Sequence, residues 1–244
     1  MSRPSFAVVL PARYASRRFP GKPLAVIGGR TLIEWVHRRA VGIRGASTVV
    51  VATDDERIAE AVRGFGADVI MTRSDHATGT DRGAEVAASL DTEVIVNLQG
   101  DEPVFDPVMV ETMVDRLRDH ESFDIVTACH RIEGRSDMED PNVVKVVVDR
   151  DGRALYFSRA PIPSGESEGA MRHVGVYAFR RDALLRFSQL ERTPLELSEH
   201  LEQLRALEHG MTIGVVETDH ATVGVDVPDD LKNIEKHLAS IYTD

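Results

Sequence analysis

Short apolar runs alternate with amphipathic segments along the first half of the chain. Apolar, often β-branched runs at residues 6–10, 48–52, 67–71 and 93–98 have the length of buried strands. Between and after them, residues 31–41, 54–64, 81–90 and 107–120 show the spacing of helices with one apolar face. Strands that are apolar throughout are typical of parallel sheets covered on both faces. The pattern predicts an α/β fold with a doubly wound, mainly parallel sheet.

The second half of the chain follows a different pattern. Two strands at 143–148 and 154–157 flank a turn, as in a hairpin, and a Pro-, Gly- and Ser-rich loop follows at 161–169. The remaining elements are a strand at 173–179, a helix at 195–209, a strand at 212–216 and a helix at 228–241. We predict one domain over residues 1–244, with an inserted subdomain at approximately 137–187. Asp54 is the predicted N-cap of the helix that ends at Gly64.

Charge and cysteine content narrow the classes of function. The net charge is −11, and Arg is interleaved with Asp and Glu, which argues against a nucleic-acid partner and against a membrane surface. A local pocket can still be positive on an acidic protein. The single cysteine, Cys129, excludes an internal disulfide and a cysteine-based zinc site, and its apolar surroundings predict a buried thiol. The N-terminal apolar run is too short for a signal peptide, so we expect a cytoplasmic protein.

A basic loop follows directly on the first predicted strand. Residues 10–24, LPARYASRRFPGKPL, contain Arg13, Arg17, Arg18 and Lys22. Ligands of open parallel sheets bind beyond the carboxyl ends of the strands, and the small residues and Gly21 allow close backbone approach. The loop therefore predicts a triphosphate site, with a solvated basic loop as the alternative.

Three further segments carry candidate chemistry. Residues 75–82, DHATGTDR, combine hydroxyl residues and a glycine before a helix, which suits a phosphate or a base edge but also an ordinary helix cap. In VNLQGDEP, residues 96–103, Asp101 follows a strand end, and in VGVDVPDDL, residues 223–231, Asp226 does the same. Two carboxylates with phosphate oxygens suit Mg²⁺, whereas Asp229 and Asp230 suit a helix N-terminus.

Taken together these motifs resemble the CMP-Kdo synthetase family, the 3-deoxy-manno-octulosonate cytidylyltransferases. The shared segments also include VATDD, NVVKVV, ALYFSRAPIP, HVGVYAF and LEQLRALEHG, and they extend from Leu10 to Leu231. The resemblance implies a fold of the nucleotide-diphospho-sugar transferase type. It also implies transfer of CMP from CTP to the anomeric hydroxyl of a sugar acid, with Mg²⁺ and release of pyrophosphate.

The resemblance assigns roles residue by residue. Asp101 and Asp226 would hold Mg²⁺ and, with Lys22, form the catalytic set. The nucleotide-binding residues would be Leu10, Pro11, Ala12, Arg13, Lys22, Thr78, Gly79, Arg82 and Gln99. The sugar acid would contact Gln99, Arg159, His173, Tyr177, Glu202 and Gln203. Without the resemblance, ordinary packing in a sheet would be the interpretation for His173 and Tyr177. His76 and His173 are possible general bases, and neither is required if the hydroxyl ionises on the metal.

The chain departs from the family pattern mainly near the sugar pocket. Thr78 and Asp81 stand where Ser and Glu are more frequent, and the segment at 163–172 is shorter. The substrate therefore stays open between Kdo, 8-amino-Kdo, a nonulosonic acid and a sugar 1-phosphate, and a non-enzymatic nucleotide-binding regulator is a further alternative.

The family also forms homodimers through the middle subdomain. Leu155, Phe157, Ile162 and Val174 are the candidate contact residues, with burial inside the monomer as the alternative for each.

Overall fold

The computed structural model describes residues 6–16, 18–132, 134–165, 169–220 and 222–241. The chain forms two compact units. Unit 1 comprises residues 1–111 and 222–244, and unit 2 comprises residues 112–221. Unit 2 contains the range 137–187, and the single domain with an insertion stays a prediction.

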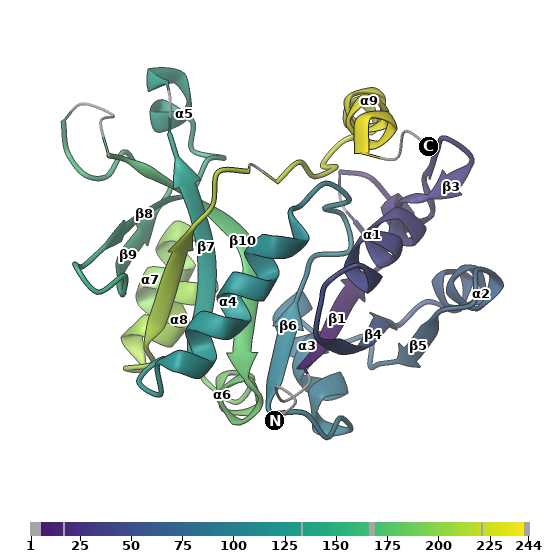
Figure 1. Cartoon of the computed structure of the whole chain (residues 1–244), viewed down its shortest axis with the longest axis horizontal. Coiled ribbons are helices and arrows are strands. Elements are labelled where there is room, and N and C mark those ends of the chain that lie inside the picture. The colour runs from purple at the N-terminus through teal and green to yellow at the C-terminus, as the bar shows by residue number, and fades with distance from the viewer. Residues whose placement is uncertain (1–5, 17, 133, 166–168, 221, 242–244) are drawn as a thin grey trace. The chain divides into compact units, whose positions relative to one another are not determined.

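Unit 1 is built on parallel strands that run side by side (Figure 1). The strands are β1 (Phe6–Ala12), β4 (Ala46–Thr53), β5 (Asp68–Met71) and β6 (Val94–Asn97), in the order β6–β1–β4–β5. All seven residues of the central strand β1 are buried, as expected for a strand covered on both faces. The parallel sheet predicted from the apolar runs is confirmed.

The helices α1 (Leu32–Val41), α2 (Glu56–Gly64) and α3 (Gly79–Ala88) connect these strands. The helix α4 (Pro107–Asp119) follows β6, and the boundary between the units falls within α4. The predicted N-cap of α2 is wrong by one residue, because Asp55 rather than Asp54 accepts the backbone N–H of Arg57. Asp54 is thereby left for another contact, described below.

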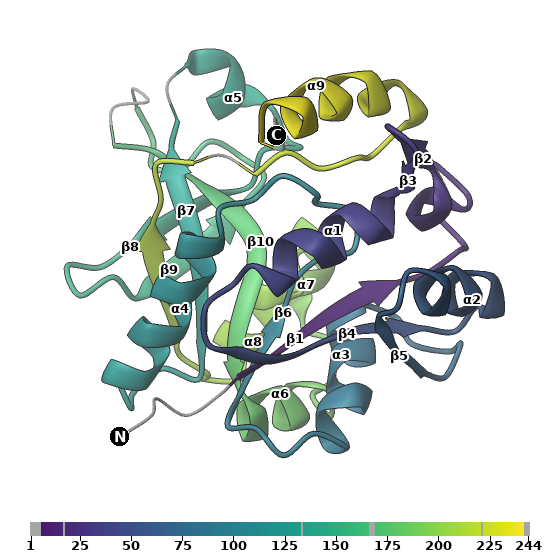
Figure 2. The same cartoon turned by 45° about the vertical axis from the view of Figure 1, so that its right-hand side comes forward.

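The C-terminal segment of the chain returns to unit 1. The short helix η2 (Pro228–Asp230) leads into α9 (Leu231–Ile241), which lies above α1 and the hairpin of β2 (Val26–Ile27) and β3 (Arg30–Thr31) in Figures 1 and 2. Ile234 and Leu238 of α9 pack in one buried cluster with Trp35, whose indole N–H donates to the carbonyl of Ile27 at 2.8 Å. This packing carries Asp226, just before η2, into unit 1.

Unit 2 is centred on strand β7 (Ile125–Arg131). The strand β10 (Met171–Arg180) pairs antiparallel with β7 on one side, and β11 (Ile213–Glu217) pairs parallel with it on the other. The predicted hairpin is confirmed as β8 (Lys145–Val148) and β9 (Ala154–Ser158), and β8 also pairs with β10. Cys129 lies buried in β7, as predicted, and burial raises the pKa of its thiol to about 12.

The described residues of unit 2 also form the short helices α5 (Arg135–Glu139), α6 (Arg181–Phe187), α7 (Pro194–Glu199) and α8 (Gln203–Glu208). The single helix predicted at 195–209 is wrong. The chain adopts a left-handed conformation at His200, with φ 54° and ψ 44°, which ends α7 before α8 begins. Such a break leaves the last carbonyls of α7 open to side-chain donors.

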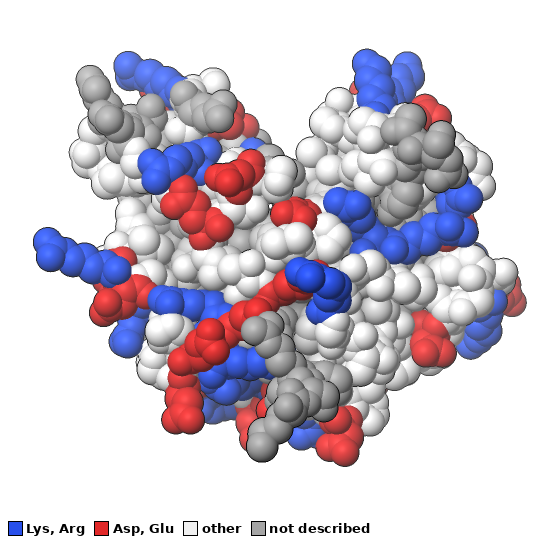
Figure 3. Space-filling model, in the orientation of Figure 1, with Lys and Arg blue, Asp and Glu red and all other residues white. Residues whose placement is uncertain are grey.

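Two surface properties bear on the sequence predictions. None of the helices in the described ranges is both long and apolar enough to span a bilayer. Basic and acidic side chains are intermixed on the face shown in Figure 3, as the interleaved sequence pattern predicts.

Candidate active site

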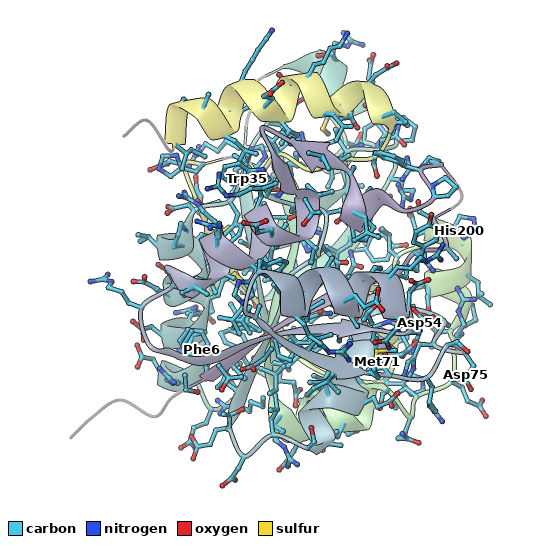
Figure 4. All side chains as sticks on the ribbon, turned by 90° about the vertical axis from the view of Figure 1, so that its right-hand side faces the viewer. Phe6, Trp35, Asp54, Met71, Asp75 and His200 are labelled. Atoms are coloured by element: carbon cyan, nitrogen blue, oxygen red, sulfur yellow. The ribbon has the colours of Figure 1, made fainter. Side chains whose placement is uncertain are left out.

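A polar pocket opens at the carboxyl ends of the unit 1 strands. Figure 4 shows Phe6, which starts β1, at one end of the strands. Asp54, which follows β4, and Met71, which ends β5, lie towards the other end, as does Asp75. The pocket at the carboxyl ends has a volume of about 440 Å³. Its lining residues are Pro11, Ala12, Arg13, Ala15, Ser16, Arg18, Lys22, Pro23, His76, Thr78, Gly79, Arg82, Gln99, Gly100, Asp101 and Asp226.

Most of the predicted nucleotide-binding residues come together in this pocket. Leu10 is the exception, because its side chain is fully buried in β1 and does not contribute to the lining. Arg17 lies outside the described residues. The guanidinium of Arg13 is exposed and makes no ion pair or hydrogen bond with any residue that the structure describes. It is thus available to an anionic ligand.

Lys22 and Asp101 form an ion pair inside the pocket. The ammonium of Lys22 donates to Oδ2 of Asp101 and, at 2.8 Å, to the carbonyl of Val225. Lys22 is the first residue of the short helix η1 (Lys22–Leu24), and Asp101 follows the turn after β6. The lysine therefore ties together the basic loop, the end of β6 and the segment that precedes Asp226.

Asp226 stands beside this pair. The amide of Val225 donates to the carbonyl of Asp101 at 2.9 Å, so the backbone places the two aspartates next to one another. Oδ1 of Asp226 accepts from Nη2 of Arg18 at 2.8 Å, and both side chains are largely exposed. Asp230 has the helix-cap role that the sequence predicted, because its Oδ2 accepts from the amides of Asp226 and Val227 at 2.7 and 2.9 Å.

The N-terminus of α3 forms another wall of the pocket. Thr78 and Asp81 form a capping box, with Thr78 Oγ1 accepting from the Asp81 amide and Asp81 Oδ2 accepting from the Thr78 amide, both at 3.1 Å. Threonine and aspartate at these positions thus make a working cap. A Cβ added to Gly79 would lie 3.4 Å from both Pro11 and Gln99, so the helix start packs closely on the end of β1. Free amides in a first helical turn suit phosphate oxygens.

Arg82 lines the pocket, but its guanidinium is held by protein groups. Its guanidinium donates to Thr72 Oγ1 and lies 3.3 Å from Oδ1 of Asp54, and the residue is only 4% exposed. The helix-cap role predicted for Asp54 did not anticipate this pair. A signal for it was present in the sequence, because Asp54 follows the end of β4 just as Asp101 follows β6.

His76 also lines the pocket, and its ring is paired with Glu85. Nε2 of His76 contacts Oε2 of Glu85, which also accepts from the Arg73 amide at 3.2 Å. The contact with His76 opposes the effect of burial and lowers the pKa of Glu85. The carboxylate of Glu85 therefore orients the imidazole, which makes His76 a wall residue rather than a free general base.

Gly100 shapes the turn between Gln99 and Asp101. A Cβ at this position would lie 2.6 Å from the carbonyl oxygen of Pro11, a distance that side chains do not tolerate. Only glycine allows the turn to lie directly against the end of β1. The close approach brings the predicted nucleotide and metal residues of two strand ends into one pocket.

Two of the predicted sugar-binding residues are neighbours in β10. His173 and Tyr177 are 9% and 6% exposed, with ring centroids 5.5 Å apart. Nε2 of His173 lies 2.9 Å from Thr127 Oγ1, and burial lowers the pKa of the imidazole to about 3. The ring is therefore neutral near pH 7 and unsuited to act as a base there, which leaves it as a packing and hydrogen-bonding group.

The remaining sugar-binding candidates lie around the break between α7 and α8. Arg159 donates from Nε to the carbonyl of Glu199 at 2.8 Å and from Nη1 to the carbonyl of Pro141 at 2.9 Å. Glu202 and Gln203 start α8 just beyond this break. Nε2 of Gln203 is buried without a hydrogen-bond partner among the described residues.

The aspartate pair fits the chemistry of a Mg²⁺ site. Asp101 and Asp226 are adjacent, line one pocket and present hard oxygen atoms, which is the donor set that Mg²⁺ takes alongside phosphate and water. No group of three or more His, Cys, Asp or Glu residues suited to a metal occurs among the described residues. The two carboxylates therefore fit a cation that is shared with a bound phosphate, rather than one caged by protein alone.

The sequence is similar to those of known proteins over most of its length. Residues 7–213 match the family described as cytidylyltransferase. A 3-deoxy-manno-octulosonate cytidylyltransferase of Syntrophotalea carbinolica is 53% identical, covering 97% of this chain and 100% of the relative. The protein of the same name from Geobacter sulfurreducens is 48% identical, covering 96% and 99%.

One solved structure is similar over both units. It is a CMP:2-keto-3-deoxy-manno-octonic acid synthetase complexed with CTP, with a TM-score of 0.92 and 43% identity. The match covers 97% of this chain and 99% of that chain. The similarity therefore extends over nearly all residues of both units.

Proposed function

This chain belongs to the cytidylyltransferase family, and we propose that it transfers CMP from CTP to the anomeric hydroxyl of 3-deoxy-manno-octulosonate or a close relative, releasing pyrophosphate. The observation that carries this proposal is the unit 1 pocket, where Arg13, Arg18 and Lys22 face Asp101 and Asp226. Relatives and the solved structure with bound CTP support both the nucleotide and the sugar acid.

The pocket supplies what a nucleotidyl transfer needs from side chains. The anomeric hydroxyl loses its proton to water, and its oxygen forms a bond to the α-phosphorus while the bond from that phosphorus to pyrophosphate breaks. Arg13, Arg18 and Lys22 are close enough in one pocket to bind the triphosphate and to offset the charge that grows on the leaving pyrophosphate. The α3 N-terminus at Gly79 adds an amide donor, and holding both reactants in line reduces the entropic cost of reaction.

The fit of the pocket supports Mg²⁺ as cofactor, held by Asp101 and Asp226. When bound, the ion would neutralise phosphate charge and lower the pKa of the attacking hydroxyl. In the structure the two carboxylates are paired with Lys22 and Arg18. A triphosphate would bind these two cations and so release the two carboxylates for Mg²⁺. In the same way, Mg²⁺ would bind the carboxylates and so release the cations for the triphosphate. We therefore expect Mg²⁺ and CTP to bind with positive coupling.

Isothermal titration tests this coupling without turnover. CTP, added without any sugar acid, should raise the affinity for Mg²⁺ by about tenfold or more, a typical coupling between sites. Arg18→Ala should increase the affinity for Mg²⁺ alone, because Asp226 loses its competing cation. Equal Mg²⁺ affinity with and without CTP would contradict the assignment of Asp101 and Asp226 as shared ligands.

The sugar acid is assigned by chemistry and by the relatives. His173, Tyr177, Gln203 and Arg159 offer an aromatic wall, an unpaired amide donor and a guanidinium, which suit sugar hydroxyls and a carboxylate. Mass spectrometry of products from CTP with Kdo, 8-amino-Kdo and a nonulosonic acid is the decisive experiment. We expect a CMP adduct of Kdo. An adduct formed with another acid alone would mean that this other acid is the substrate. If no acid in the set gives pyrophosphate release, the proposed activity is refuted.

We also propose a homodimer, with Leu155 at the contact. This side chain is 58% exposed on β9, whereas Phe157 and Val174 are buried within unit 2. Phe157 and Val174 are therefore buried inside the monomer, as the alternative predicted, and we do not propose them as dimer contacts. Light scattering should give a dimer at micromolar concentration and a shift towards monomer in Leu155→Lys. A monomeric wild-type protein would refute the dimer.

A further inference from the structure

Tyr14 lies at the start of the basic loop, but its side chain does not line the pocket. The edge of its ring faces Gly21, where an added Cβ would lie 3.1 Å from Cε2 and Cζ. The guanidinium carbon of Arg57 lies 3.4 Å from the centroid of the same ring. The aromatic ring is thus held between the end of its own loop and the first turn of α2.

The backbone of Tyr14 closes the loop on itself. Its carbonyl accepts from the amides of both Ser16 and Gly21 at 2.9 Å. Gly21 has φ +73°, a conformation that side chains rarely adopt, and Lys22 follows it directly as the first residue of η1. The position of the Lys22 ammonium therefore depends on how the Tyr14–Gly21 contact is held.

Arg57 is fixed before it meets the ring. Asp55, the N-cap of α2, accepts from Arg57 Nε at 2.9 Å through Oδ1 and from Nη2 at 2.6 Å through Oδ2. The hydrogen bonds with Arg57 lower the pKa of Asp55 and raise that of Arg57, so both stay charged at neutral pH. This bidentate ion pair holds the plane of the guanidinium in one orientation and leaves the face of the guanidinium free to stack on an aromatic ring.

We propose that Tyr14 and Arg57 are positioning residues for the triphosphate-binding loop. Arg57, held by Asp55, supports the Tyr14 ring; the ring supports the turn at Gly21; and the turn sets Lys22 and the loop cations towards one pocket. Neither residue lines that pocket. The inference rests on the proposed function, because it assigns the loop to the phosphates of CTP.

The contact predicts a specific kinetic pattern. A loop that must be ordered on binding weakens the ground-state complex, so loss of the support should raise the dissociation constant and KM for CTP. The value of kcat should change by less than about twofold, since the saturated complex restores the loop geometry. KM for the sugar acid should be unchanged.

The variants are chosen with matched controls on the same elements. Tyr14→Ala should raise the dissociation constant of CTP about tenfold, and Tyr14→Phe less than about twofold, because the stacked ring is retained. Arg57→Ala should raise it about threefold. Arg63→Ala is the control, because Arg63 is on the same helix but is ion-paired with Glu56, whereas Arg57 stacks on the Tyr14 ring. The double variant Tyr14→Ala/Arg57→Ala should be no weaker than Tyr14→Ala alone.

Titration calorimetry with CTP and steady-state kinetics distinguish the outcomes. If wild-type protein with CTP and Kdo releases no pyrophosphate, the proposed function fails. If the wild type is active and Arg57→Ala binds CTP like Arg63→Ala, the positioning role is overturned. If Tyr14→Phe is as weak as Tyr14→Ala, the hydroxyl and not the stacked ring acts, which also overturns it. Arg57 is more than half exposed, so its variant keeps the test available even if Tyr14→Ala does not fold.

Discussion

The amide of Val225 donates to the carbonyl of Asp101 at 2.9 Å, and this hydrogen bond sets the proposed catalytic carboxylates beside one another. Asp101 follows β6, whereas Asp226 belongs to the segment that returns from unit 2 to form α9. Lys22 strengthens the junction, because its ammonium contacts both Asp101 and the carbonyl of Val225. The relationship carries the central prediction about the reaction.

Asp101→Asn and Asp226→Asn should each lower kcat by about 100-fold or more while leaving the fold intact. Each change keeps the shape of the side chain and removes the charge that would hold a cation against the phosphates. Pyrophosphate release at saturating Mg²⁺ and CTP measures the loss, with circular dichroism to check folding. CTP should still bind through Arg13 and Lys22.

The control for these variants is Asp229→Asn, which removes a negative charge in the first turn of η2 without changing a side chain that lines the pocket. It should keep kcat within about threefold, since that charge acts on the helix N-terminus and not on the reacting atoms. Near-normal kcat in Asp101→Asn or Asp226→Asn would mean that the carboxylate in question is a turn or helix cap alone.

Gly100→Ala should lower kcat/KM by about 10- to 100-fold, because the new methyl group would meet the Pro11 carbonyl at 2.6 Å and displace the turn. Stability should fall by about 1–3 kcal/mol, as for other overpacked sites. Gly64→Ala, at the end of α2 with no atom within 4 Å of the added carbon, is the matched control and should be neutral or slightly stabilising. Equal effects of the two substitutions would disprove the close contact.

We expect the buried imidazole of His173 to make a contribution to the free energy of unfolding that is lost at acid pH. Burial lowers the pKa of its imidazole from 6.5 to about 3, so between these values the unfolded chain binds a proton that the folded chain does not. Stability from this residue is complete above pH 6.5 and falls as the pH drops, by at most about 1.4 kcal/mol per pH unit. Urea unfolding at pH 7 and pH 5 should show a smaller loss in His173→Gln than in the wild type. Equal losses would mean that the imidazole titrates normally in the fold.

We expect the buried ammonium of Lys145 to stabilise unit 2. Its fully buried ammonium donates to the carbonyls of Asp140, Val143 and Arg159 at 2.7–2.9 Å. Lys145→Met should cost about 2–3 kcal/mol, because buried carbonyls would lose their partner. Lys236→Met on the exposed face of α9 is the control and should stay within about 0.5 kcal/mol. Chemical denaturation measures both, and equal stability of the two variants would contradict the prediction.

Local sequence pattern specifies the elements and most of the pocket in unit 1. Apolar runs such as that of β1 define buried strands, and parallel strands bring their carboxyl ends to one edge of the sheet. Arg13 and Asp101, which follow two of these strands, could therefore be assigned to one site from the order of residues alone. The resemblance of the motifs supplied the nucleotide and the sugar acid, which periodicity does not specify.

The partner that each charged side chain takes depends instead on the folded chain. Asp54 and Asp55 are neighbours in sequence, yet one pairs with Arg82 and the other caps α2 and holds Arg57. The break at His200 likewise belongs to the folded backbone, which adopts a left-handed conformation there, whereas the sequence at 195–209 predicted one uninterrupted helix. Short-range sterics and burial define helices and strands, whereas ion pairs and close contacts such as Gly100 on Pro11 join segments that meet only after folding.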